Sequence, residues 1–244
     1  MTRKLNRKRR RACLLRSLGP GSGRRKTGNA GKPAVRQTGL GWVSGNWSGY
    51  AIEGNPGSFR RISGAWTVPA VRPGSGSAYS SAWIGIDGFR NDSLIQTGTG
   101  HEYVGGKAHY YAWWEILPDA ETVIPLPVYP GDRIRAVIAK RSRTKWAIRL
   151  SNLTRCWTFY TLQSYEGPQS SAEWIVEAPQ VGGTVARMAR LTPVRFVQCR
   201  VNGCNPGLKA SQSGVMLQNG RFVSIPSRPS RAGDAFVVTN EAQP

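Results

Sequence analysis

The chain of 244 residues is long enough for one large all-β domain or two small domains, and 39% hydrophobic residues are compatible with a packed core. A formal charge of +21 is typical of nucleic-acid-binding proteins, but here the charge is uneven. Residues 1–36 hold 13 of the 34 Lys and Arg and no acid, so the remainder carries 21 − 13, or +8. No stretch approaches the roughly 20 apolar residues of a membrane span.

Residues 1–40 mix Lys and Arg with Gly, Pro and Ser, a composition that cannot bury enough apolar surface to fold. We predict a disordered basic extension. Its charge would attract RNA or anionic membranes without specificity, so no specific nucleic-acid partner is expected. Arg10 and Arg11 precede a short apolar run, Ala12 to Leu15, which is shorter than the core of an export signal.

From residue 41 to residue 244, short runs rich in Val, Ile, Thr, Trp and Tyr alternate with Gly, Pro, Asn and Asp, the pattern of antiparallel strands and turns. Their close spacing without a fixed repeat predicts a single β-sandwich domain. Residues 185–190 would form either a helical turn or a loop. The predicted strands are 47–52, 59–67, 80–87, 93–98, 108–116, 133–140, 145–152, 156–164, 171–177, 193–199, 214–217 and 234–239.

Several catalytic classes lack their residues. Only His101 and His109 are available as imidazole bases, and we expect both to be ordinary loop or surface residues. No His-Glu-x-x-His motif or Cys cluster predicts a metal site, and no cofactor is expected. None of the five Asp residues precedes Thr-Gly or Ser-Gly, which excludes the aspartic peptidase turns. Cys199 and Cys204 flank a turn-like segment, so a hairpin disulfide is geometrically plausible in an exported protein.

Carboxylates inside apolar strands are the most informative residues, because burying an ionised group is costly. In "SAEWIVE", alternation places Glu173 and Glu177 on one face, and in "YYAWWEILP" Glu115 follows two Trp residues. These acids could instead lie on a solvated outer face. Glu115 with Glu177 or Glu173 could also form the carboxylate pair of a glycosidase.

Seven motifs, in this order and spacing, resemble the glutamic peptidases, the eqolisin family, over about residues 45–200. They are "NWSGYAI" (46–52), "GAWTVPAV" (64–71), "SAWIGIDG" (81–88), "LIQTGTG" (94–100), "YYAWWEILP" (110–118), "YPGDRI" (129–134) and "SAEWIVEAP" (171–179).

The resemblance implies a lectin-like sandwich of two antiparallel sheets, whose concave face binds an extended polypeptide and cleaves it at acid pH with a Gln and Glu pair. By position the catalytic pair would be Gln96 and Glu177, with Glu173 as the fallback for the acid. Trp83, Asp87 and Glu115 would line the substrate groove. The resemblance also implies export from the cell, and we expect a monomer.

The proposed pair is chemically reasonable, since a carboxylate with a pKa near ~4.3 remains a base where His is protonated. Glu177 would take a proton from the attacking water, while the amide of Gln96 would donate to the oxyanion and orient the water. A sandwich that binds carbohydrate or extended peptide without catalysis is the alternative hypothesis.

Overall fold

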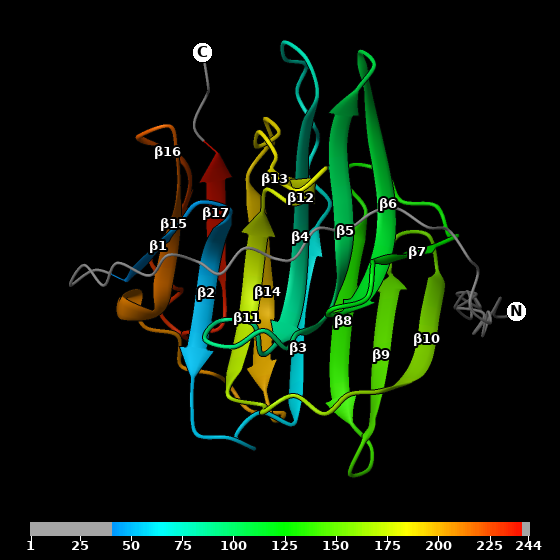
Figure 1. The fold of residues 1–244 in the computed structure, drawn as a ribbon, viewed down its shortest axis with the longest axis vertical. Coiled ribbons are helices and arrows are strands. Elements are labelled where there is room, and N and C mark those ends of the chain that lie inside the picture. The colour runs from blue at the N-terminus through cyan, green and yellow to red at the C-terminus, as the bar shows by residue number, and fades with distance from the viewer. Residues whose placement is uncertain (1–40, 241–244) are drawn as a thin grey trace, which may run out of the picture.

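The computed structural model describes residues 41–240, so the predicted basic extension, residues 1–40, lies outside the described residues. The described chain consists of strands and a single 3-10 helix, Ala210–Gln212. Most strands run along the long axis of the molecule (Figure 1). Within residues 41–240 no helix is long and apolar enough to cross a membrane.

The strands form two packed layers of mostly antiparallel strands that are continuous through the pairing of β16 with β17. The first layer runs in the order β16 (Arg221–Pro226), β15 (Ser213–Gln218), β2 (Trp47–Glu53), β11 (Ser171–Glu177), β4 (Ala78–Ile86), β5 (Ile95–Val104), β6 (Lys107–Ile116) and β7 (Thr122–Ile124), with β1 (Trp42–Ser44) parallel to β15. The second layer runs in the order β10 (Trp157–Ser164), β9 (Lys145–Asn152), β8 (Arg133–Lys140), β3 (Arg61–Thr67), β14 (Val194–Val201) and β17 (Phe236–Asn240). A separate pair, β12 (Gln180–Val181) and β13 (Thr184–Val185), forms a small ribbon.

The main core lies between the layers and follows from strand alternation, which buries every second side chain. Two Trp residues join the layers by hydrogen bonds: Trp66 Nε1 donates to Thr99 Oγ1 at 3.0 Å, and Trp174 Nε1 donates to the Ser63 carbonyl at 3.0 Å. Gly64 makes room for Trp174, since a Cβ there would lie 2.8 Å from the indole ring. The predicted sandwich is confirmed, and these contacts set how the layers face each other.

A second apolar cluster covers the outer face of the first layer. It includes four Trp residues, and Trp47 and Trp83 pack edge to face with ring centroids 5.0 Å apart. Its buried members are Trp42, Trp47, Ala51, Trp83, Phe89, Leu94, Trp113 and Ile175. This layer is therefore apolar on both faces, which explains why β4 and β11 read as almost continuous buried runs.

Every predicted strand is present, but several details of the sequence prediction were wrong. The strand predicted to end at residue 98 continues to Val104, so His101 is a fully buried strand residue and not a loop residue. Glycines at 98 and 100 serve close packing here, because a Cβ on Gly98 would lie 2.4 Å from the Ala82 carbonyl oxygen. Of the two alternatives for residues 185–190, the loop is correct: this segment contains only the end of β13 and an isolated bridge.

The hairpin disulfide that the sequence left open does not form, and Cys199 and Cys204 are both free thiols. The turn between them is tight, because Asn202 and Gly203 have positive φ and Val201 pairs directly with Cys204. Cys199 is therefore two residues away from the partner position of Cys204, and its side chain is buried in the core.

Candidate active site

The outer face of the first layer brings the predicted site residues together. Antiparallel register aligns them in three neighbouring rows, because side chains two residues apart share a face. The rows are Glu115, Gln96, Gly85 and Glu173; then Trp113, Gly98, Trp83 and Ile175; then Tyr111, Gly100, Ser81, Glu177 and Trp47. Gln96 and Glu177 thus belong to the same face, on strands β5 and β11.

Gln96 is held by Glu115 on the adjacent strand. Its Nε2 donates to Glu115 Oε2 at 2.5 Å, and both side chains are buried. Gln96 Oε1 is buried and has no partner among residues 41–240, so this carbonyl oxygen is free to accept a hydrogen bond. Burial raises the pKa of Glu115 to about 8, and the charges of Glu177 and Glu121 add to the rise. Glu115 is therefore neutral over the acid range.

Glu177 is held by donors from two other strand regions. Its Oε2 accepts from Trp83 Nε1 at 2.8 Å, and its Oε1 accepts from Asn46 Nδ2 at 3.3 Å. Burial raises the pKa of Glu177 to about 7, and hydrogen bonds to the carboxylate, that from Trp83 foremost, limit the rise. Because the charge of Glu177 also raises the pKa of Glu115, the two carboxyl groups lie close enough to interact.

Sequence analysis missed Asn46, which directly contacts the candidate acid. Its side-chain oxygen accepts from Ser44 Oγ at 3.0 Å, which turns the amide nitrogen toward Glu177. The signal was present, because Asn46 opens the first of the family motifs. A second missed pair is Glu102 and Tyr111: Tyr111 Oη donates to Glu102 Oε1 at 3.0 Å on the same face.

Glu173 shares the row of Gln96 but differs from Glu177 in its contacts. It is fully buried, and neither carboxyl oxygen has a partner among the described residues. Burial raises its pKa well above the ordinary value, the Ser171 hydroxyl partly offsets this rise, and the charges of Asp87 and Glu53 add to it. Glu173 is therefore a neutral acid, and Glu177 is the better placed of the two candidates to carry a charge.

Asp87 binds the loop of residues 165–170. Its carboxylate is fully buried and accepts from Tyr165 Oη at 2.6 Å and from the backbone N–H groups of Gln169 and Ser170, each at 2.8 Å. Asn91 Nδ2 also donates to it at 3.3 Å. These bonds hold residues 165–170 in place and give Asp87 a structural role, while its predicted place in the substrate groove stays a prediction.

The remaining candidates do not contribute catalytic groups. Burial lowers the pKa of His101 to about 3, and its Nε2 lies 2.8 Å from Thr99 Oγ1 in the core. His109 is exposed on β6. No group of three or more His, Cys, Asp or Glu side chains in residues 41–240 is arranged to hold a metal ion.

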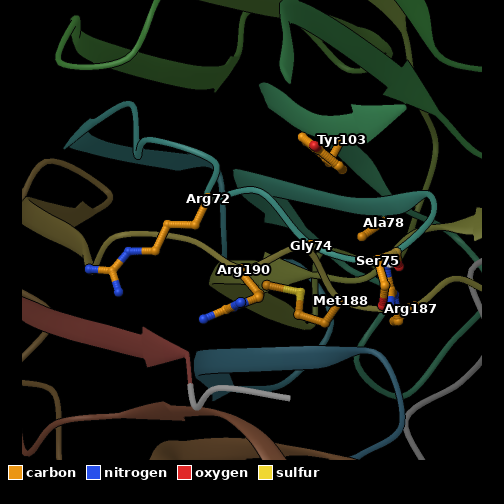
Figure 2. Close-up of a pocket in the computed structure, with 8 residues that line it drawn as sticks. All are labelled: Arg72, Gly74, Ser75, Ala78, Tyr103, Arg187, Met188 and Arg190. Atoms are coloured by element: carbon orange, nitrogen blue, oxygen red, sulfur yellow. Dashed lines mark hydrogen bonds between the residues drawn. The ribbon is translucent and has the colours of Figure 1, made fainter. Parts of the chain in front are cut away.

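A separate pocket lies between residues 72–78 and 187–190, with Tyr103 of β5 on one side (Figure 2). Arg187 donates to the carbonyl oxygens of Ser75 and Gly76, so it braces the loop that forms one wall. The pocket includes no carboxylate and none of the residues that hold Gln96 or Glu177. We therefore assign no catalytic role to it.

Comparison with known proteins identifies the family of the chain. A profile of the peptidase A4 family matches residues 45–228. The chain is 29% identical over 223 residues to aspergillopepsin-2 of Aspergillus niger, covering 80% of this chain and 77% of the relative. It is 33% identical over 113 residues to scytalidopepsin B of Scytalidium lignicola, covering 46% and 42%.

Solved structures share the fold. A crystal structure of scytalido-glutamic peptidase with a transition state analog inhibitor aligns with a TM-score of 0.69 at 23% identity, covering 81% of this chain and 98% of that one. The aspergilloglutamic peptidase from Aspergillus niger aligns with a TM-score of 0.60 at 27% identity, covering 67% and 99%. Since the family profile spans most of the described residues, the chain belongs to the peptidase A4 family and is a glutamic peptidase.

Proposed function

We propose that this glutamic peptidase is an endopeptidase that hydrolyses polypeptides with Gln96, Glu177 and an activated water. The observation that supports the pair most strongly is its complementary hydrogen bonding on one face. Gln96 has a free, buried carbonyl oxygen, whereas the Glu177 carboxylate is held by Trp83 and Asn46. An acceptor and a base on the same face are what water activation requires.

Gln96 Oε1 accepts a hydrogen bond from the water, and Glu177 removes a proton as the water oxygen attacks the scissile carbonyl carbon. Gln96 Nε2 has a second hydrogen, besides the one donated to Glu115, which stabilises the oxyanion. The C–N bond then breaks, and Glu177 returns its proton to the leaving nitrogen, which yields an acid and an amine.

Burial of the two carboxyl groups sets the expected pH range. Glu177 must be ionised to act as a base, and with a pKa of about 7 its ionised fraction falls about tenfold per pH unit below that value. Glu115 must stay neutral so that no second charge faces Glu177. Glu115 is neutral below its own pKa of about 8. We infer an optimum between about pH 7 and pH 8, which is closer to neutral pH than the acid optimum that the resemblance implies.

Two substitutions test the pair. Gln96→Ala and Glu177→Gln should each reduce the digestion of a denatured protein at least about a hundredfold, since the loss of one oxyanion donor alone costs 10²–10³ in rate. Glu173→Gln is the matched control on the same strand and should keep most of the activity. Loss in Glu173→Gln with normal activity in Glu177→Gln would reverse the assignment. Binding of peptide or glycan by the wild type without any turnover would favour the non-catalytic sandwich.

Location and assembly remain proposals from family membership. We propose that the enzyme acts outside the cell as a monomer, with no cofactor. Fractionation of the native host tests the location, and light scattering of the purified full chain tests the monomeric state.

A further inference from the structure

The strands of the second layer carry positively charged side chains and no negatively charged ones. Strands β3, β8, β9, β10 and β14 contain no Asp or Glu. Alternation turns their apolar residues into the core and leaves the cationic ones in solvent. We use the name basic face for five exposed residues of these strands: Arg133, Arg135, Lys145, Arg149 and Arg195.

The charged groups of the basic face are spaced along and across the strands, whereas a site for one small anion would bring them together. Arg133 and Arg135 are two residues apart on β8, a separation of about 6.6 Å along a strand. Arg149 pairs with Val137 of β8, which makes it the diagonal neighbour of Arg135, at about 7–8 Å. Such spacing suits a ligand that carries repeated negative charges along an extended chain.

Nothing within residues 41–240 neutralises the basic face. The ion pairs of this part of the chain involve Arg90, Arg155 and Arg200, none of which belongs to it. Lys145 makes only a neutral contact, donating from Nζ to Ser164 Oγ at 2.8 Å. Since neighbouring like charges on a sheet destabilise it, these cations cost the fold stability, and a partner that pairs with them would explain their presence.

The side chains around the cations indicate which class of polyanion could bind to the basic face. Arg135 pairs with Ala65 on one side and with Ser151 on the other, and both side chains are small, so an extended polymer can lie close to the sheet there. Tyr160 and Leu162 are the exposed large apolar residues of these five strands. That is too few for the aromatic platforms that bind single-stranded nucleic acid, and too few for the apolar band that enters a bilayer.

We propose that the basic face binds an extended polysaccharide that bears repeated carboxylates. Guanidinium groups match carboxylates in bidentate geometry, and the sugar rings would lie over the small side chains between them. The face is on the opposite side of the sandwich from Gln96 and Glu177, so a bound polymer leaves the catalytic groove open. The enzyme would thereby be held on an acidic matrix while it digests polypeptides.

The test measures binding of the full chain to sodium polygalacturonate at pH 6 by calorimetry, at 50 and 200 mM NaCl. The test variant combines Arg135→Glu with Arg149→Glu. The matched control combines Arg221→Glu with Arg228→Glu, two exposed arginines outside the basic face that change the net charge equally. Thermal unfolding and digestion of a soluble denatured protein show that each variant is folded.

We expect the test variant to lose at least about tenfold in affinity at 50 mM NaCl and the control to stay within about twofold, with weaker binding for every protein at 200 mM. Equal loss in both variants would overturn the proposal, because net charge would then explain the binding. Unchanged affinity in the test variant would overturn it too. Tighter, Arg135-dependent binding of oligothymidylate or phosphatidylserine vesicles would replace the polysaccharide by that partner. These readouts are independent of catalysis, so failure of the Gln96 and Glu177 proposal would not affect them.

Discussion

The hydrogen bond from Trp83 to Glu177 should set the lower end of the pH range. Trp83→Phe removes the Nε1–H donor, which lies 2.8 Å from Glu177 Oε2, while keeping an aromatic ring in the apolar cluster. A hydrogen bond to a charged acceptor contributes about 1.5–3 kcal/mol, and one pKa unit corresponds to about 1.36 kcal/mol. The pKa of Glu177 should therefore rise by about one to two units.

The assay is kcat/KM against pH for a fluorogenic peptide. In Trp83→Phe the acid limb should move upward by the same one to two units, which gives a loss of about 10- to 100-fold at pH 6 and a smaller loss near pH 8. Trp113→Phe is the matched control, because Trp113 is buried in the same cluster but its Nε1 has no partner among the described residues. Its acid limb should not move. A Trp83→Phe profile that superimposes on the wild type would refute the assigned role of this bond.

Three further predictions concern stability. Because the folded pKa of Glu177, about 7, exceeds its unfolded value of 4.5, and Glu115 behaves in the same way, folding should be most favourable below pH 4.5 and should weaken as pH rises to about 8. Urea unfolding should show a loss of about 3 kcal/mol from Glu177 alone, and Glu177→Gln should flatten the curve. Gly64→Ala should cost about 1–3 kcal/mol by overpacking against Trp174, as measured by denaturant titration. Asp87→Ala should lower the free energy of unfolding by a similar amount and increase proteolytic nicking at residues 165–170. The kcat of the folded fraction should not change. A selective rise in KM would instead indicate that Asp87 lines the substrate groove.

The fold class was predictable because strand alternation and turn residues recur throughout the chain. Strands β8, β9 and β11 were predicted with the bounds that the structure shows. Short strands such as β7 and β12 were missed, because two or three residues contain no readable period. The extension of β5 through Gly98 and Gly100 was missed for another reason: glycine usually marks a turn, and only the neighbouring strand shows that it permits close approach here.

By itself the sequence determined the β-sandwich, the family and the positions of Gln96 and Glu177, because these depend on local periodicity and on motifs that are contiguous in the chain. The tertiary structure decided what each acid does. Trp83 and Asn46, which are remote from Glu177 in the chain, donate hydrogen bonds to its carboxylate. Glu173 is buried without comparable donors, and Asp87 binds a loop. Hydrogen bonding and desolvation depend on neighbours that are remote in sequence, so identical residue types acquired different roles only after the strands were assembled.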